Sequence, residues 1–334
     1  MEGLWMFVEL MLFLFPIVML HELGHFVAAK MSGVKVNVVS FGFGRKLFGY
    51  KDSAGVLWQL ALFPLGGYVK MQEGLSEPDS YENKSPLIRA FICVSGPLAN
   101  FLLSSLILVC ASVYISLYYE EGVVLGIQHE SVAEKIGISK GDVILTVNGR
   151  SISEISSIYG KENQDLVILL RRGTDNLVFS TTVSNLTELG VHITTKRSIF
   201  SSIVSGLSET FIMCKQIFLG IPTLLKSVFN EGDKVGIVGP IGVANLVHST
   251  LQKNVLALLF FMAVLSMNLG VFNLLPIPGL DGGNIVMCFL DFIALLLFKK
   301  KIPQNIQKIL LFIGFVFIIA ILISASISDV KNFR

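Results

Sequence analysis

The stretch His21-Glu22-Leu23-Gly24-His25 lies inside a long apolar run that begins near residue 4. Two histidines four residues apart fall on the same face of a helix, so both imidazoles can reach a single metal ion. Glu22 projects toward the same centre and is placed to accept a proton from a metal-bound water. Ionisable side chains near the centre of a bilayer cost roughly 2.5–3.5 kcal/mol each on insertion scales. Metal coordination would explain why three of them are clustered there.

Two simpler interpretations of this stretch compete with a metal site. A single histidine in a membrane helix more often packs or forms a hydrogen bond than binds a metal. A cleaved signal peptide could also account for residues 1–29, but the segment has no basic start and its apolar part is long. We therefore expect a membrane span that carries a metal site.

The composition is that of an integral membrane protein. Of 334 residues, 53% are hydrophobic and 15% are charged, whereas soluble domains are about 25% charged. The net charge of +2 is too small to indicate nucleic acid as a partner. No pair among the four cysteines (Cys93, Cys110, Cys214 and Cys288) has the spacing of a disulfide framework or a zinc ribbon.

Apolar segments long enough to cross a core of about 30 Å occur at residues 4–29, 91–118, 255–273 and 309–327. Basic residues gather after the first segment and before the fourth, at residues 30–70 and 299–308. The positive-inside rule places both basic loops in the cytoplasm and both chain termini outside it. The expected fold class is an α-helical polytopic membrane protein with about four transmembrane helices.

The region at 34–71 favours strands and turns. Residues 34–39 and 56–63 are strand candidates, with turn signals at Gly42 and Gly44 and again at Gly66-Gly67. Two interpretations remain open. The segment is either a cytoplasmic hairpin or a membrane-associated β-hairpin that enters the bilayer beside the metal, where protein or a water-filled cavity shields its backbone. Residues 1–118 form the expected N-terminal membrane domain.

Residues 119–196 change character, because charges return and the apolar runs shorten to strand length. We expect a short helix at 132–136, a tight turn at Asn148-Gly149, and strands at 123–127, 141–149, 166–171 and 177–183. The stretch 131–149 resembles the PDZ domain pattern. This resemblance implies an inserted α+β PDZ domain that binds extended peptides or chain ends by strand addition; the alternative is an inert spacer that filters access.

Residues 197–253 are expected to form an amphipathic connecting helix and a loop. Apolar residues recur at helical spacing between 199 and 229, but Glu209, Lys215 and Lys226 interrupt any span. A helix that lies on the outer surface of the membrane is therefore preferred to one that crosses it.

The C-terminal membrane domain, residues 254–334, contains an irregular stretch within apolar surroundings that extend to residue 298. It reads Asn273-Leu274-Leu275-Pro276-Ile277-Pro278-Gly279-Leu280-Asp281-Gly282-Gly283. Its prolines and glycines break the preceding helix at membrane depth, which indicates a lined cavity or a site.

Catalytic zinc usually takes three protein ligands and a water, and the membrane segments offer four further candidates: Glu9, His248, Asp281 and Asp291. Glu9 precedes His21 by about three helical turns, too far for a shared ion. His248 is expected near the outer boundary of the membrane. Asp281 is the remaining choice, although it could instead be a helix N-cap, and Asp291 is the reserve.

Taken together and in chain order, the motif at 21–25, the stretch 63–71, the PDZ-like insert and the stretch 273–283 resemble the site-2 protease family, with the bacterial RseP-type proteases as the nearest match. The resemblance implies a zinc-dependent intramembrane endopeptidase of the bacterial inner membrane, in which His21, His25 and Asp281 bind zinc and Glu22 is the general base. It further implies a set of substrate-binding residues: Asn273, Gly42, Gly44, Gly66 and Gly67.

The substrates implied by the resemblance are single-span membrane proteins already shortened outside, such as anti-sigma factors or signal-peptide remnants. Two features depart from the RseP-type pattern. The chain has room for one PDZ domain instead of two, and Asn284 stands where relatives often carry histidine. A rival hypothesis from another class is a non-catalytic PDZ scaffold or receptor, in which the histidines are structural and no zinc is needed.

Overall fold

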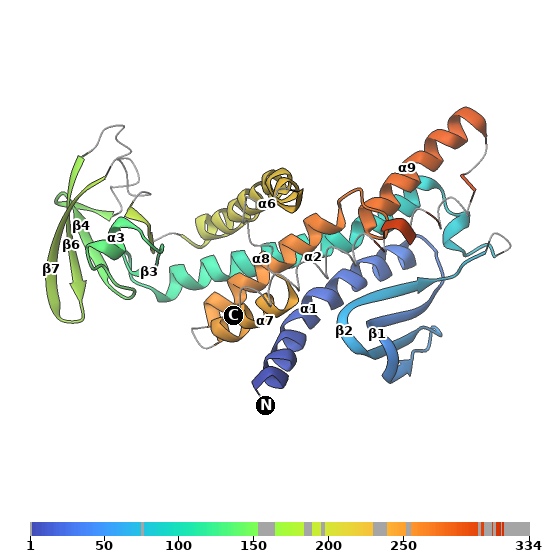
Figure 1. Ribbon diagram of the computed structural model, residues 1–334, viewed down its shortest axis with the longest axis horizontal. Helices are drawn as coiled ribbons and strands as arrows, with labels where there is room; N and C mark the ends of the chain where they lie inside the picture. Colours follow the sequence, from blue (N-terminus) through green and yellow to red (C-terminus); the bar gives the residue numbers. More distant parts are fainter. Residues whose placement is uncertain are drawn as a thin grey trace. The chain divides into compact units, whose positions relative to one another are not determined.

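The computed structural model describes residues 2–74, 77–152, 164–183, 189–194, 198–229, 239–251 and 255–299, together with 302–303, 309, 312–314 and 316. The chain divides into two compact units, which are considered separately (Figure 1). The first combines Met1–Leu108 with Ser208–Arg334, and the second is Val109–Leu207.

Among the described residues, four helices are long and apolar enough to cross a membrane. They are α1 (Glu2–Met31), α2 (Pro86–Tyr118), α8 (Val255–Asn273) and α9 (Asp281–Phe298). The first three coincide with predicted spans.

The fourth helix was not predicted. The sequence pattern predicted an irregular stretch at 273–283 and no span in the apolar residues that follow it up to 298, but an 18-residue helix begins at Asp281. Proline and glycine are confined to the first residues of that region, so the apolar sequence after them can form all its backbone hydrogen bonds as a helix. The span predicted at 309–327 falls almost entirely outside the described residues.

Helix α1 is the central element of the first unit. It packs against α7 (Pro240–Leu251), α8 and both strands of the neighbouring sheet. Its N-terminal half buries Leu10 and Phe13 against Val247 of α7, and its C-terminal end buries Ala28 and Ala29 under the sheet. Helix α7 lies in a region for which only a loop was expected after the amphipathic helix.

Small residues let the helices of the first unit approach one another closely. A Cβ atom at Gly24 of α1 would lie 2.3 Å from the carbonyl oxygen of Ser95 on α2. A Cβ atom at Gly270 of α8 would lie 2.5 Å from the ring of Phe101, also on α2. Both glycines are therefore required at these crossings, and α2 contacts α1 and α8 at backbone distance.

Strands β1 (Val36–Lys51) and β2 (Leu57–Met71) pair antiparallel and confirm extended structure in this region. Their register is more complex than that of one hairpin, because residues 46–51 pair with 57–61 while residues 36–41 face both 57–60 and 67–71. Gly42 and Gly44, with φ of +103° and +87°, lie where β1 changes partner. Glycine adopts this left-handed backbone without steric cost. Entry of the sheet into a bilayer stays a prediction. The 3-10 helix η1 (Tyr81–Asn83) follows before α2.

The second unit contains two small sheets. One pairs β3 (Val124–Ile127) with β8 (Val191–Ile193); the other has the order β5-β4-β6-β7, from β4 (Val143–Val147), β5 (Arg150–Ser151), β6 (Gln164–Arg172) and β7 (Asp175–Val183). The short helix α3 (Val132–Lys135) packs on them. Alternate residues of β6, namely Leu166, Ile168 and Leu170, are buried in the core, as expected for a sheet with one covered face.

These elements confirm the strands and the short helix predicted for 123–183. The predicted tight turn is also present: Asn148 and Gly149 have φ of 52° and 74° and join β4 to β5, with Val147 paired to Arg150. Residues 199–229 form the helix α6 (Ile199–Phe229). Helix α6 is not among the candidate spans of the described residues, and its position on the membrane stays a prediction.

Candidate metal centre

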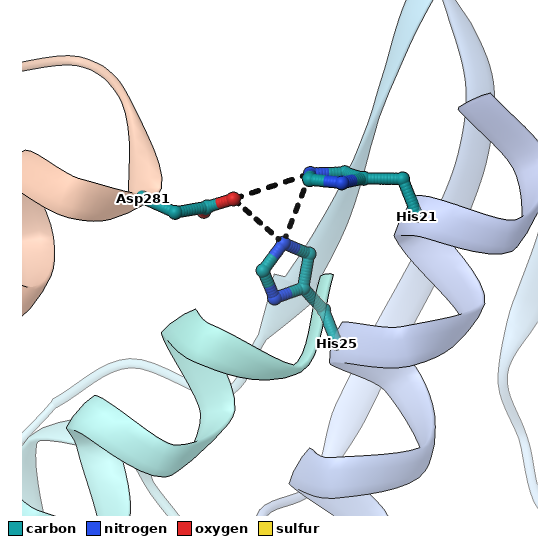
Figure 2. Close-up of side chains that lie close together, drawn as sticks. All are labelled: His21, His25 and Asp281. Atoms are coloured by element: carbon teal, nitrogen blue, oxygen red, sulfur yellow. Dashed lines mark hydrogen bonds and ion pairs between the residues drawn. The ribbon is translucent and has the colours of Figure 1, made fainter. Parts of the chain in front are cut away.

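Three side chains from distant parts of the sequence converge inside the first unit (Figure 2). His21 and His25 project from neighbouring turns of α1, and Asp281 projects from the first residue of α9. Oδ2 of Asp281 lies 3.2 Å from Nε2 of His21 and 3.3 Å from Nε2 of His25. The two Nε2 atoms are themselves 3.3 Å apart. Three atoms that can each donate an electron pair therefore face one point.

The irregular stretch between α8 and α9 delivers the aspartate. Helix α8 ends at Asn273, and the chain turns through Gly279, whose φ is +97°. Cβ atoms at Gly282 and Gly283 would lie 2.2 Å from the carbonyl oxygen of Leu275 and 2.3 Å from that of Ile277. Only glycine fits at both positions, so the turn can fold tightly against the start of α9.

Asp281 is not the N-cap of α9, which was the alternative role considered for it. The N-cap residue is Leu280, which makes no side-chain capping bond. The carboxylate instead points away from the helix toward the histidines, as Figure 2 shows. Its place in the first helical turn is favourable in itself, because the positive end of the helix dipole stabilises negative charge there.

Contacts with helix α2 fix the ring of His25. Nδ1 of His25 donates a hydrogen bond to the carbonyl oxygen of Ile92 at 2.8 Å, which leaves the lone pair of Nε2 directed at Asp281. Gly96 provides the space for this ring, because a Cβ atom there would lie 2.2 Å from Nε2. Backbone contacts from α2 thus determine both the tautomer and the position of His25.

The arrangement fits a zinc ion. Oδ2 of Asp281 is buried and accepts no hydrogen bond from the residues that the structure describes, although it lies between two imidazole nitrogens. A buried carboxylate oxygen without a partner is costly, and a cation at the convergence point would remove that cost. Two histidines and one carboxylate form a ligand set used by catalytic zinc sites, which leave one further position for water or substrate.

A cavity of about 790 Å³ opens beside the three side chains. Glu22 lines it, although its side chain is only 6% exposed. Gly67 packs against that side chain, since a Cβ atom at Gly67 would lie 2.7 Å from Cγ of Glu22. Asn273 reaches the same place, with Nδ2 3.3 Å from Nε2 of His21. The cavity therefore contains a carboxylate, an amide and the three converging atoms.

Of the residues predicted to bind substrate, Gly66, Gly67 and Asn273 line this cavity. Gly42 and Gly44 are not among its lining residues and lie instead where β1 changes partner.

Comparison with known proteins identifies the family. Residues 9–321 match the family described as peptidase family M50. This chain belongs to that family. A relative from Clostridium perfringens is 30% identical over 328 residues, which cover 94% of this chain and 95% of the relative. Relatives from Campylobacter jejuni (31% over 342 residues, 95% and 90% covered) and Helicobacter pylori strain 26695 (31% over 364 residues, 98% and 99% covered) are similar to the same extent.

All three relatives carry the name "putative zinc metalloprotease". Family membership across most of the chain makes this protein a zinc metalloprotease, and the four long apolar helices among its described residues indicate an integral membrane protein.

The other three candidate zinc ligands of the M50 protease have different partners. Asp291, the reserve ligand, is buried, accepts a 2.6 Å hydrogen bond from Arg89 of α2 and accepts another from the backbone amide of Ile302 at 3.0 Å. The reserve assignment is therefore wrong, because this carboxylate neutralises a buried guanidinium. Glu9 was excluded on its distance from His21, and His248 on its expected position near the outer boundary of the membrane. In the structure these two side chains pair with each other at 2.8 Å between α1 and α7.

Sequence reasoning did not connect Asn100 with the site of the M50 protease. In the structure, Nδ2 of Asn100 lies 3.2 Å from Nδ1 of His21. One signal could have suggested the contact. Ile92, Gly96 and Asn100 are spaced four residues apart, as the two histidines are, so one face of α2 can follow one face of α1.

Proposed function

We propose that this M50 protease cleaves peptide bonds within the transmembrane segments of single-span proteins, with zinc held by His21, His25 and Asp281. The observation that carries the proposal is the convergence of three donor atoms, 3.2–3.3 Å apart, in a cavity that Glu22 also lines. The stretch 63–71 and the motifs at 21–25 and 273–283 support it through their resemblance to site-2 proteases.

When bound, zinc supplies a Lewis acid that polarises the scissile carbonyl and makes water more acidic. The Glu22 carboxylate accepts one proton from the attacking water as the oxygen adds to the carbonyl carbon. It then returns that proton to the amide nitrogen as the C–N bond breaks, so that a carboxylic acid and an amine leave. General acid–base transfer of this kind contributes roughly 10²–10⁴-fold. The side-chain amide of Asn273 can donate a hydrogen bond to the oxyanion.

A transmembrane substrate must first expose its backbone, because a helix satisfies its own carbonyl groups. Each polar backbone group freed in hydrocarbon costs several kcal/mol. Residues 66–71 of β2 line the cavity, and in the sheet residues 67–71 pair with residues 36–41. Pairing of the unwound substrate with this strand would offset the cost by strand addition. Gly42 and Gly44 would contribute through the bend that they allow in β1.

The remaining parts of the proposal rest on resemblance and on charge. The second unit acts as a PDZ domain that binds a peptide or chain end, and the substrates are anti-sigma factors or signal-peptide remnants in regulated intramembrane proteolysis of the RseP type. The protein is located in the bacterial inner membrane, and the positions of its basic loops support the topology. Both termini and the second unit lie outside the cytoplasm, and the metal centre lies toward the cytoplasmic side. A purely non-catalytic scaffold is not favoured, because the family is one of zinc metalloproteases.

The test uses the purified full chain and a tagged single-span substrate. We expect Glu22→Gln to abolish cleavage while it retains about one zinc ion per chain, and His25→Ala to lose both. Glu77→Gln, the same chemical change at an exposed residue of the first unit, is the matched control and should be neutral. Undiminished turnover by Glu22→Gln would refute the assigned base, and a wild-type protein without zinc would refute the metal site.

A further inference from the structure

We propose that Asn100 is a positioning residue that holds His21 in the tautomer and orientation needed for metal binding. The inference rests on the proposed zinc site and concerns a residue outside the ligand set. Asn100 lies on α2, is fully buried, and contacts His21 on the side of the ring opposite to the convergence point.

The surroundings of Asn100 leave one of its amide atoms without a partner. Nδ2 lies 3.2 Å from Nδ1 of His21, whereas Oδ1 is buried and makes no hydrogen bond within the described part of the chain. The backbone of Asn100 is anchored independently, because its carbonyl oxygen accepts a hydrogen bond from Ser266 of α8 at 2.9 Å. The side-chain amide can therefore rotate while its helix stays in place.

The tautomer of His21 decides which amide atom must face it. Nε2 of His21 points at Asp281, so Nε2 must be unprotonated to bind a cation, and the ring proton must then sit on Nδ1. An N–H group needs an acceptor, and half a turn about the Cβ–Cγ bond of Asn100 exchanges Nδ2 for the unpartnered Oδ1. With Oδ1 in place, Nδ1 of His21 donates its proton to Oδ1 of Asn100.

His25 shows the same arrangement with a different acceptor. Its Nδ1 donates to the carbonyl oxygen of Ile92, two helical turns before Asn100 on α2. One face of α2 thus provides an acceptor for the Nδ1–H group of each histidine: the backbone carbonyl of Ile92 for His25 and the side chain of Asn100 for His21. Removal of such an outer partner weakens metal affinity by about 10–100-fold.

An interhelical hydrogen bond with a purely structural role would have a different signature, because it would alter stability without altering the metal. The test measures zinc affinity of the purified full chain by competition with a chromophoric chelator, and the absorption bands of the cobalt(II)-substituted protein. We expect Asn100→Leu, which removes the acceptor at similar size, to weaken zinc binding about 10–100-fold and to shift the cobalt bands. Asn100→Asp, which keeps an acceptor oxygen, should stay close to wild type.

Ser104→Ala is the matched control, since Ser104 is also buried on α2, one turn further on, and its hydroxyl has no hydrogen-bond partner among the described residues. It should leave zinc affinity unchanged. Wild-type affinity and cobalt bands in Asn100→Leu, or equal losses in Asn100→Leu and Asn100→Asp, would overturn the inference. If the leucine variant does not fold, Asn100→Ala carries the same comparison. Failure of the zinc site itself would appear separately, as zinc retention by His25→Ala.

Discussion

Replacement of Gly96 by alanine tests how closely α2 controls the metal centre. The added Cβ atom would lie 2.2 Å from Nε2 and 2.6 Å from Cε1 of His25. Since favourable contacts between such atoms begin near 3.5 Å, the ring would have to retreat by roughly 1.3 Å. That movement would break the 2.8 Å hydrogen bond from Nδ1 to the carbonyl oxygen of Ile92.

A misplacement of about 1 Å at a catalytic centre can cost 10²-fold in rate. We therefore expect kcat/KM of Gly96→Ala to fall by about 10²-fold, equivalent to about 2.7 kcal/mol, with weaker zinc binding. The helix itself should not suffer, because alanine is the better helix former by about 1 kcal/mol. The loss would then arise from the clash with His25 alone.

The assay compares kcat/KM on a tagged single-span substrate with zinc content after gel filtration. Gly220→Ala is the matched control, because a Cβ atom at Gly220 of α6 would meet nothing within 4 Å. It should retain wild-type zinc and activity. If Gly96→Ala also retains wild-type zinc and activity, α2 does not hold His25 in place and the role assigned to α2 at the metal centre is wrong.

Three further predictions concern Asp281 and Asp291 in the first unit and two residues of the second unit, Asp142 and Ile168. Asp281→Ala should lose zinc. Asp291→Ala should keep zinc, but its free energy of unfolding should fall by about 3–5 kcal/mol because the buried arginine partner would be left unpaired. Metal content and thermal unfolding separate the two variants, and zinc loss in both would contradict the assignment of Asp281 as the ligand. In the second unit, two 2.8 Å hydrogen bonds from Arg172 hold the pKa of Asp142 below its usual range. This pair therefore stabilises the folded state at pH values above the unfolded pKa of Asp142, and the stabilisation is lost as pH falls through the lower folded pKa. The protection factors of residues 164–172 in the full chain, which correct exchange for the intrinsic effect of pH, should therefore fall below about pH 4. Arg172→Ala should flatten this dependence on pH; an unchanged slope would show that the Asp142–Arg172 pair does not contribute. Ile168→Ala removes a fully buried side chain from the same core and should cost about 2–5 kcal/mol, seen as faster proteolysis of the second unit with zinc content unchanged.

Local patterns predicted much of the fold. Long apolar runs located α1, α2 and α8, a short apolar run located β6, and Asn148-Gly149 located a hairpin turn, because each of these signals depends only on residues near one another in sequence. The prediction failed at α9. No helix was assigned to the apolar residues after the stretch rich in proline and glycine, although these residues act only on the turn that contains them or follows them.

The sequence by itself determined that this protein is a membrane protein and that His21 and His25 share one face of a helix. Hydrophobic content and helical period are sufficient for both, since neither depends on how the chain folds back on itself. Only the tertiary structure decided which carboxylate joins the histidines and that Asn100 contacts one of them. Periodicity specifies which face of a helix is buried but not which distant residue meets it. The contact with Asn100 depends on how closely α1 and α2 pack at Gly24 and Gly96, and the position of Asp281 depends on the tight turn at Gly282 and Gly283.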